Sequence, residues 1–244
     1  MLHIARLGKM VEEEIQSIYL NETIMLKIYK PEKFSELYKY HLCIMQDGND
    51  YYQIGRIARL SDELHRSGDI ERTIFIGIHY ADKADRWKKY HPDGEQQQAY
   101  MKFLRHEVLA LLDDTLPTYH MGQSRILLGD SLAGTLALQT AIQYPHTFGK
   151  VILQSPYVNQ TVLDAVKNAA PMHSLDVYHT IGSNETAVTM TDDSIVDFLT
   201  PNRRLHELLT KQGAQCEYYE QANGEHTWKY WQQDLQHALT STFA

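Results

Sequence analysis

The chain has 244 residues, which is enough to bury a large core in one α/β domain, and we expect a single domain over residues 1–244. Acidic side chains outnumber basic ones, 31 to 23, and this balance argues against a nucleic acid partner. Residues 1–14 lack an apolar signal core, and no run of about 18 apolar residues occurs. We therefore predict a cytoplasmic protein with no membrane partner.

The cysteines indicate the redox compartment of the protein, and the histidines indicate whether it has a zinc site. The two cysteines, Cys43 and Cys216, lie in predicted apolar strands, which favours buried free thiols in a reducing compartment over a disulfide. The 13 histidines are scattered and none has the spacing of a zinc site. We expect neither a metal nor a cofactor. The oligomeric state stays open, a homo-oligomer included.

The predicted elements alternate along most of the chain. Apolar and β-branched runs predict strands at 13–19, 23–29, 41–45, 73–79, 125–128, 151–154, 176–181 and 217–220. Helical periodicity occurs at 95–112, 132–144, 201–212 and 228–239. The first two strands predict an antiparallel hairpin that turns at Asn21-Glu22. The later alternation indicates an α/β fold with a mostly parallel sheet, an antiparallel leading edge and helices on both faces.

The most informative motif follows the strand at 125–128. Residues 129–134 read Gly-Asp-Ser-Leu-Ala-Gly and run directly into the helix at 132–144. A serine flanked by small residues between a strand and a helix is typical of the nucleophile elbow of the α/β-hydrolase fold. A serine hydroxyl needs such a position, between a base and hydrogen-bond donors, because it is a poor nucleophile by itself. Ser131 is therefore the candidate nucleophile.

The acid and the base should follow the nucleophile in that order along the chain. Glu185 comes just after the strand at 176–181 and is the candidate acid, with Asp192 and Asp193 as competitors in the same loop. His226 lies between the strand at 217–220 and the last helix and is the candidate base. His206 and His237 lie inside predicted helices, where a surface role is the simpler explanation.

Two backbone amides should stabilise negative charge on the substrate carbonyl oxygen. One belongs to the residue after the nucleophile, Leu132. The other should come from the loop that follows an early strand. The strand at 41–45 ends in Gln46-Asp47-Gly48-Asn49-Asp50, and Asn49 is the candidate donor, with Asp50 as the open alternative.

Five short motifs in this order carry a family resemblance. They are Asp47-Gly48, residues 129–134, Ser155-Pro156, residues 182–185 (Gly-Ser-Asn-Glu) and residues 224–228 (Gly-Glu-His-Thr-Trp). With the segment Arg86 to Pro92, they make the chain resemble the Putative esterase family from about residue 13 to its carboxyl terminus. This esterase D-like group includes feruloyl esterases, siderophore trilactone esterases and mycolyltransferases. The resemblance implies ester hydrolysis through an acyl-serine, with Ser131, Glu185 and His226 as nucleophile, acid and base.

The sequence departs from the family pattern at two positions. Ala133 replaces a glycine of the elbow, and Glu225 replaces the second glycine before the histidine. The second departure puts the backbone before His226 in question.

Candidate substrate-binding residues follow from their positions. They are Arg86, Trp87 and Tyr90 in the irregular insertion at 81–94, Tyr157 after Ser155-Pro156, and Trp228 beside the base. Aromatic side chains at a pocket mouth can hold a sugar or an aryl group, but they can equally pack under a long loop. Arg86 can hold an anionic group, or form a surface ion pair with Asp82 or Asp85.

These features together predict a serine carboxylesterase acting on small or short-chain esters. The polar insertion at 81–94 does not resemble the apolar lid that a long acyl chain would need. An acyltransferase of the same family is the alternative within enzymes. A non-catalytic α/β-hydrolase scaffold that binds a ligand or partner is the alternative outside them.

Overall fold

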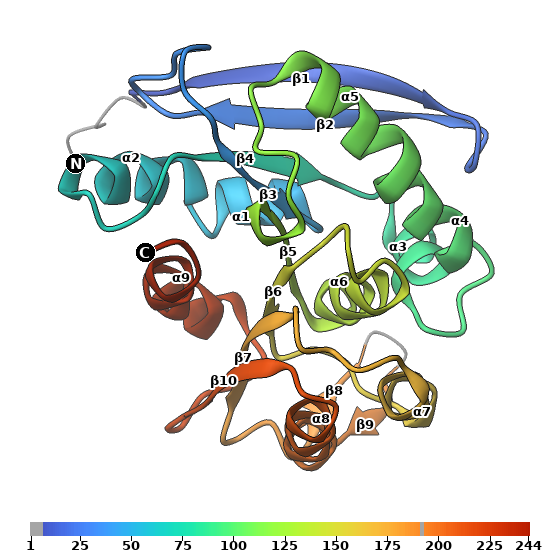
Figure 1. Ribbon diagram of the computed structural model, residues 1–244. Coiled ribbons are helices and arrows are strands. Elements are labelled where there is room, and N and C mark those ends of the chain that lie inside the picture. The colour runs from blue at the N-terminus through green and yellow to red at the C-terminus, as the bar shows by residue number, and fades with distance from the viewer. Residues whose placement is uncertain (1–6, 191–192) are drawn as a thin grey trace.

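A computed structural model describes residues 7–190 and 193–244 (Figure 1). Within these residues, eight strands form one sheet in the order β1-β2-β4-β3-β5-β6-β7-β10. The strands are β1 (Lys9–Ser17), β2 (Glu22–Lys30), β3 (His41–Met45), β4 (Thr73–Ile78), β5 (Arg125–Asp130), β6 (Lys150–Gln154), β7 (Asp176–Gly182) and β10 (Gln215–Gln221). β2 pairs antiparallel with β1 and β4, and all later neighbours are parallel. The α/β-hydrolase architecture with an antiparallel leading edge is confirmed.

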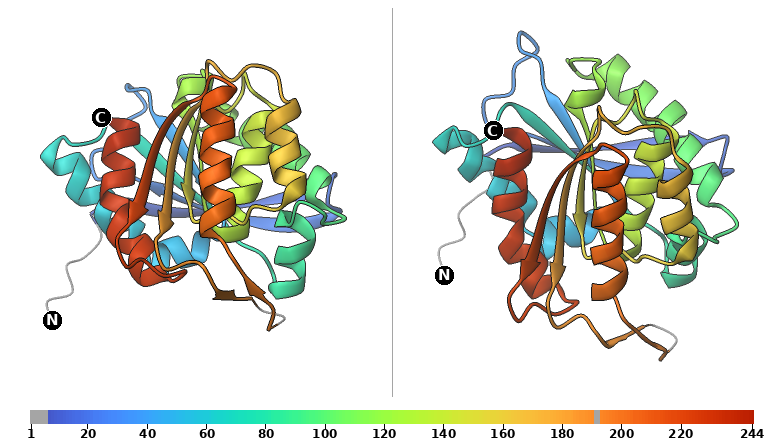
Figure 2. Two further views of the ribbon diagram at one scale, coloured as in Figure 1. Left: turned by 90° about the horizontal axis from the view of Figure 1, so that it is seen from below. Right: turned by 60° about the horizontal axis from the view of Figure 1, so that its bottom comes forward.

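Helices cover both faces of the sheet (Figure 2). One face packs against α1 (Gly48–Gln53), α2 (Ile57–Ser67) and α9 (Trp228–Phe243). The other packs against α4 (Gln97–Phe103), α5 (Leu109–Thr115), α6 (Ser131–Gln143), α7 (Gln160–Asn168) and α8 (Leu199–Lys211). Because both faces are covered, the central strands are mostly apolar, and every residue of β4 is buried.

Several elements differ from the sequence expectation. The insertion at 81–94 is not wholly irregular, since it contains α3 (Lys83–Tyr90), whose first turn is capped by the Asp82 side chain. Short helices α1, α2 and α7 were not predicted, and the predicted helix at 95–112 is divided between α4 and α5 by a π-helical turn at Leu104–Val108. Strand β1 begins and ends earlier than predicted because its mostly exposed residues give a weak apolar signal. The hairpin connection spans residues 18–21, with Asn21 in the left-handed region.

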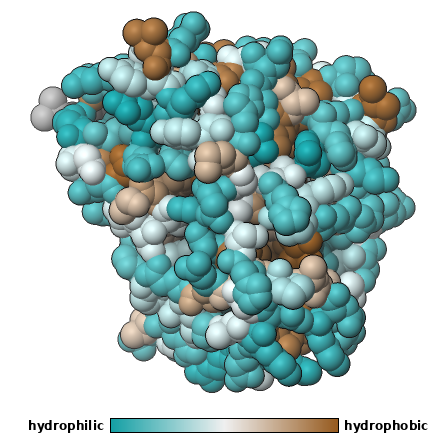
Figure 3. All heavy atoms as spheres, viewed as in Figure 1, coloured by the Kyte–Doolittle hydropathy of each residue, from teal (hydrophilic) through white to brown (hydrophobic). Residues whose placement is uncertain are grey.

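The surface carries few large apolar patches on the face seen in Figure 3, where hydrophobic residues form small separate groups among hydrophilic ones. β8 (Val188–Thr189) and β9 (Ile195–Val196) form a short antiparallel ribbon outside the main sheet. Of the helices in the described part of the chain, none combines the length and apolar character needed to cross a bilayer.

Candidate active site

The elbow between β5 and α6 places Ser131 at the carboxyl edge of the sheet. Ser131 has φ 50°, in the left-handed region that non-glycine residues rarely adopt. The turn is so tight that a Cβ on Gly129 would lie 2.3 Å from the carbonyl carbon of Ala133. Glycine is required at position 129, whereas Ala133 itself is accommodated as a buried residue. The departure of Ala133 from the family glycine therefore leaves the elbow intact.

Ser131, His226 and Glu185 form one hydrogen-bonded chain. His226 Nε2 lies 3.0 Å from Ser131 Oγ, and His226 Nδ1 lies 2.6 Å from Glu185 Oε2. Glu185 and His226 reach the same edge as Ser131 because β5, β7 and β10 run parallel and end there. Of the competing acids, Asp193 is exposed, with its amide bonded to the Met190 carbonyl, and Asp192 lies outside the described residues. The three side chains are therefore linked by hydrogen bonds in the order Ser131, His226 and Glu185.

Hydrogen-bond donors other than His226 hold the second oxygen of the Glu185 carboxylate, and we call this set the Ser155 relay. Its Oε1 accepts from the Gly182 amide at 2.8 Å and from Ser155 Oγ at 2.6 Å. Ser155 Oγ in turn accepts from Trp231 Nε1 at 3.0 Å. All these groups except the histidine are buried, so the bonds fix the carboxylate in an apolar setting. Sequence reasoning gave Ser155 no role and missed Trp231, which the spacing His226-x-Trp228-x-x-Trp231 could have indicated.

The loop that carries His226 approaches the loop that carries Glu185 at two glycines. A Cβ on Gly182 would lie 2.5 Å from the Gly224 carbonyl carbon, and a Cβ on Gly224 would lie 2.7 Å from Gly182 Cα. Glu225 is exposed. The tight position before the histidine is thus occupied by a glycine, and the Glu225 departure falls where a side chain fits.

The candidate oxyanion donors occupy the first turns of two helices. Leu132 is the second residue of α6, and Asn49 is the second residue of α1. Amides at these positions have no carbonyl partner within their own helix, so they can bind a substrate oxygen. The Asn49 side chain accepts from Lys27 Nζ at 2.7 Å. Asp50, the alternative, donates its amide to the Asp47 carbonyl instead.

Arg86 does not pair with Asp82 or Asp85, which were the partners in one of the two alternatives that the sequence left open. Its Nη2 donates to Asp47 Oδ2 at 2.6 Å, and its Nε lies 3.1 and 3.0 Å from the two Asp47 carboxylate oxygens. Asp82 caps α3, and Asp85 pairs with Lys89. The Arg86 fork is thus occupied by a carboxylate of this chain.

Asp130, between Gly129 and Ser131, adds an unusual buried acid. Its side chain is buried, and Oδ1 has no hydrogen-bond partner among the described residues. Burial raises the pKa of the Asp130 carboxyl well above its usual range, and the negative charge of Asp47 raises it further, while Arg86 acts in the opposite direction. Burial and Asp47 also raise the pKa of Asp50. Arg86 opposes both increases in pKa, and His79 also opposes the increase at Asp50.

The other candidate substrate residues differ in what they offer. Tyr90 is fully buried against the rings of Tyr80 and Tyr100, so in this structure it cannot touch a bound substrate. Trp228 packs edge-on against Tyr51 and Trp231 as part of the core around α9. These two side chains are explained by packing.

Trp87 and Tyr157 instead belong to a row of rings that leads to the histidine. Trp87, 48% exposed, stacks on His91 with ring centroids 4.7 Å apart, and His91 contacts Tyr157 at 5.3 Å. Tyr157 contacts Phe198 at 5.9 Å, and Phe198 contacts His226 at 4.3 Å. Sequence reasoning missed both His91, although it lies in the segment Arg86 to Pro92, and Phe198, which lies in no motif.

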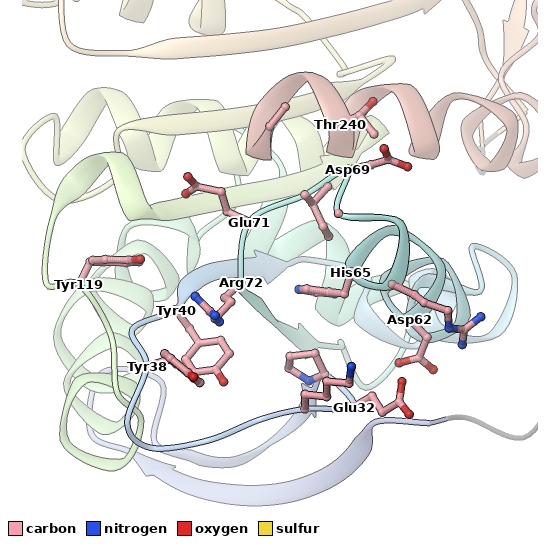
Figure 4. A pocket seen from close by; sticks show the side chains of 16 residues that line it. Glu32, Tyr38, Tyr40, Asp62, His65, Asp69, Glu71, Arg72, Tyr119 and Thr240 are labelled. Atoms are coloured by element: carbon pink, nitrogen blue, oxygen red, sulfur yellow. The ribbon is translucent and has the colours of Figure 1, made fainter.

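A cavity of about 1070 Å³ lies at the opposite end of the sheet, where β3 and β4 begin (Figure 4). Its wall includes Tyr38, stacked under the Arg72 guanidinium at 4.0 Å, and the carboxyl-terminal Ala244. The triad is at the carboxyl edge, so this cavity is not part of the candidate active site. Within residues 7–190 and 193–244, no group of His, Cys, Asp or Glu is arranged to hold a metal ion.

The buried acid at position 130 should make stability depend on pH. An unfolded aspartate loses its proton near pH about 3.9, whereas the folded Asp130 keeps its proton to a higher pH. Folding of the wild type therefore loses stability as pH rises through this window. Asp130→Asn keeps the shape without the ionisation, so its free energy of unfolding relative to wild type should increase from pH 4 upward.

Urea denaturation at several pH values measures this difference. Asp164→Asn, on an exposed part of α7, is the matched control for loss of a carboxyl group. A gap between Asp130→Asn and wild type that stays constant with pH would contradict the assignment.

The Ser155 relay should contribute measurably to stability. Ser155→Ala removes a donor to Glu185 and leaves the buried Trp231 Nε1–H without its acceptor, which should cost about 1–3 kcal/mol. Chemical denaturation measures the loss, with Ser67→Ala at an exposed position of α2 as the control. Equal stability of the two variants would mean that the relay bonds contribute nothing.

Comparison with known proteins places the chain among esterases. The model of the Putative esterase family matches residues 17–242. The protein YjcH of Bacillus subtilis (strain 168), described as uncharacterized, is 45% identical over 232 residues, which cover 95% of this chain and 96% of that protein.

Solved structures share the fold at low sequence identity. A ferulic acid esterase superposes with a TM-score of 0.79 at 17% identity, over 97% of this chain and 98% of its own. The enterobactin esterase FES from Shigella flexneri, solved in the presence of enterobactin, gives a TM-score of 0.79 at 18% identity; the match covers 96% of this chain but 59% of that one. The BES protein from Bacillus cereus gives 0.77 at 17% identity over 100% and 97% of the two chains. The chain belongs to the Putative esterase family, and this membership supports a hydrolase that acts on esters.

Proposed function

We propose that the protein is a serine carboxylesterase that hydrolyses small or short-chain esters through an acyl-serine intermediate. The observation that carries the proposal is the hydrogen-bonded chain from Ser131 through His226 to Glu185 at the carboxyl edge of the sheet. Family membership independently supports ester hydrolysis.

The first half of the reaction forms the acyl-serine. His226 Nε2 takes the proton of Ser131 as Oγ attacks the ester carbonyl carbon, and Glu185 stabilises the resulting imidazolium through Nδ1. The amides of Leu132 and Asn49 bind the negative oxygen of the tetrahedral intermediate. The intermediate collapses when the bond to the alcohol oxygen breaks, and His226 returns the proton to that oxygen.

The second half repeats these roles with water. His226 takes a proton from a water molecule, the water oxygen attacks the acyl carbon, and the carboxylic acid leaves as Ser131 regains its proton. Side chains and amides of this chain supply every step, so the mechanism requires no metal or cofactor.

The row of rings beside His226 supports a small substrate group. Tyr157 lies next to the nucleophile in space, since its amide donates to the Ser131 carbonyl at 3.1 Å. Its ring contacts Phe198, which contacts the His226 ring, and aromatic rings so placed can contact a flat or apolar part of an ester. The neighbouring helix α3 is rich in charged residues, and this composition favours compact over long acyl chains.

Hydrolysis of p-nitrophenyl esters from acetate to decanoate tests the proposal. Ser131→Ala and His226→Ala should lower kcat by about 10⁴-fold or more, and Glu185→Gln by about 10³- to 10⁴-fold, because the amide favours the wrong histidine tautomer. Activity should be greatest for the short acyl chains.

His237→Ala, at an exposed position of α9, is the matched histidine control and should keep wild-type activity. A fluorophosphonate probe should label the wild type and not Ser131→Ala. A wild type that hydrolyses no ester and stays unlabelled would favour a ligand-binding scaffold.

A further inference from the structure

The ion pair between Arg86 and Asp47 joins two segments at the candidate active site. Arg86 comes from α3, in the insertion after β4, and Asp47 comes from the loop between β3 and α1. The Asp47 side chain is 3% exposed and that of Arg86 is 19% exposed. Nε and Nη2 of the guanidinium both face the carboxylate, a fork geometry that fixes direction as well as distance.

Asp47 determines how α1 begins. Its backbone is left-handed, with φ 55° and ψ 36°, and its carbonyl accepts from the amides of Asp50 and Tyr51. A left-handed aspartate costs free energy and persists only where neighbouring contacts hold it. The next residue, Gly48, is pressed against β4, since a Cβ there would lie 2.4 Å from Gly77 Cα. The first turn of α1, which includes the Asn49 amide, thus depends on Asp47.

The charge around Asp47 makes Arg86 necessary on electrostatic grounds as well. The buried Asp130 interacts with the Asp47 carboxylate and carries the nucleophile as its next residue. Without Arg86, the buried Asp47 carboxylate would lose its cation partner and be left as an uncompensated buried charge. The Asp47 loop would then be free to move away from the elbow.

We propose that Arg86 is a positioning residue for oxyanion binding: its ion pair with Asp47 holds the first turn of α1, and so the Asn49 amide, against the developing negative charge. The inference rests on the proposed esterase function. It assigns Arg86 to the transition state rather than to recognition of an anionic group on the substrate.

The two alternatives leave different kinetic signatures. A residue that contacts the substrate in both ground and transition states raises KM when it is removed, with kcat unchanged. A purely structural ion pair lowers stability and leaves the kcat of the folded enzyme intact. A residue that places an oxyanion donor lowers kcat, with KM nearly constant.

Arg86→Lys is the decisive variant because it keeps the positive charge beside Asp47 and Asp130 but loses the fork. Displacement of a catalytic group by about 1 Å can cost about 10²-fold, so kcat for p-nitrophenyl acetate should fall by about 10- to 100-fold. KM should change by less than about threefold. A boronic acid, which forms a tetrahedral adduct with serine, should bind more weakly by a similar factor.

Asp47→Asn is the second variant, since asparagine also tolerates the left-handed backbone. It should lower kcat in the same way. Arg203→Lys is the matched control, because Arg203 makes an equally two-pronged pair with Glu220, but on the exposed side of α8. It should retain wild-type kinetics.

Folded Arg86→Lys with kcat within about twofold of wild type, or with KM raised at constant kcat, would overturn the inference. Loss of native circular dichroism in both Arg86→Lys and Asp47→Asn would also overturn it, in favour of a structural ion pair. Failure of the proposed function is distinguishable, because the wild type itself would then be inactive and unlabelled by fluorophosphonate.

Discussion

The close approach of Gly129 to Ala133 is the constraint on which the candidate site depends. The chain leaves β5 and enters α6 within one residue, and only glycine at position 129 leaves room for the helix backbone. Ser131 is forced into the left-handed region at this turn, which lifts its hydroxyl from the sheet edge toward the neighbouring loops. The Tyr157 amide then fastens the turn to the loop after β6 by donating to the Ser131 carbonyl.

The other members of the chain of hydrogen bonds follow from the parallel order of the strands. β6 lies between β5 and β7, and β7 pairs with β10, so their carboxyl ends form one edge. The contact between Gly182 and Gly224 brings the loops after β7 and β10 together. Trp231 comes from α9. Buried hydrogen bonds hold this helix in place, since Gln154 donates to the Trp231 carbonyl and to the Asp234 carboxylate. The acid is thus supported from the sheet and from a helix on its far side.

The sequence predicted the parts of this arrangement that local pattern encodes. Ser131 and His226 stand out because each joins a strand to a helix within a short motif, and the order of strands and helices was sufficient for the fold class. Helix α2 has apolar residues at helical spacing, Ile57, Ala58 and Leu64, and its period could have been found. The partner of Arg86 could not, since Asp47 lies 39 residues earlier. Nor could the burial of Tyr90, which depends on how α3 packs onto α4 rather than on residues near it in sequence.

Strained backbone at the ends of the strands is the common feature of this site. Non-glycine residues with positive φ follow β3, β5, β6 and β10 within two residues: Asp47, Ser131, Ser155 and Asn223. Each such residue costs of order 1–3 kcal/mol unless it is held, and each is held by a contact already described or by a neighbouring loop.

Arg86 holds Asp47, the Tyr157 amide holds Ser131, and Trp231 and Glu185 hold Ser155. The Asn223 amide donates to Ser183 in the loop of the acid. Because the left-handed turns end the strands abruptly, they bring Ser131, Ser155 and the Asp47 loop to the same carboxyl edge of the sheet. The free-energy cost of these strained residues is offset by the burial of the parallel strands beneath them. A rigid sheet and a strained edge therefore occur together.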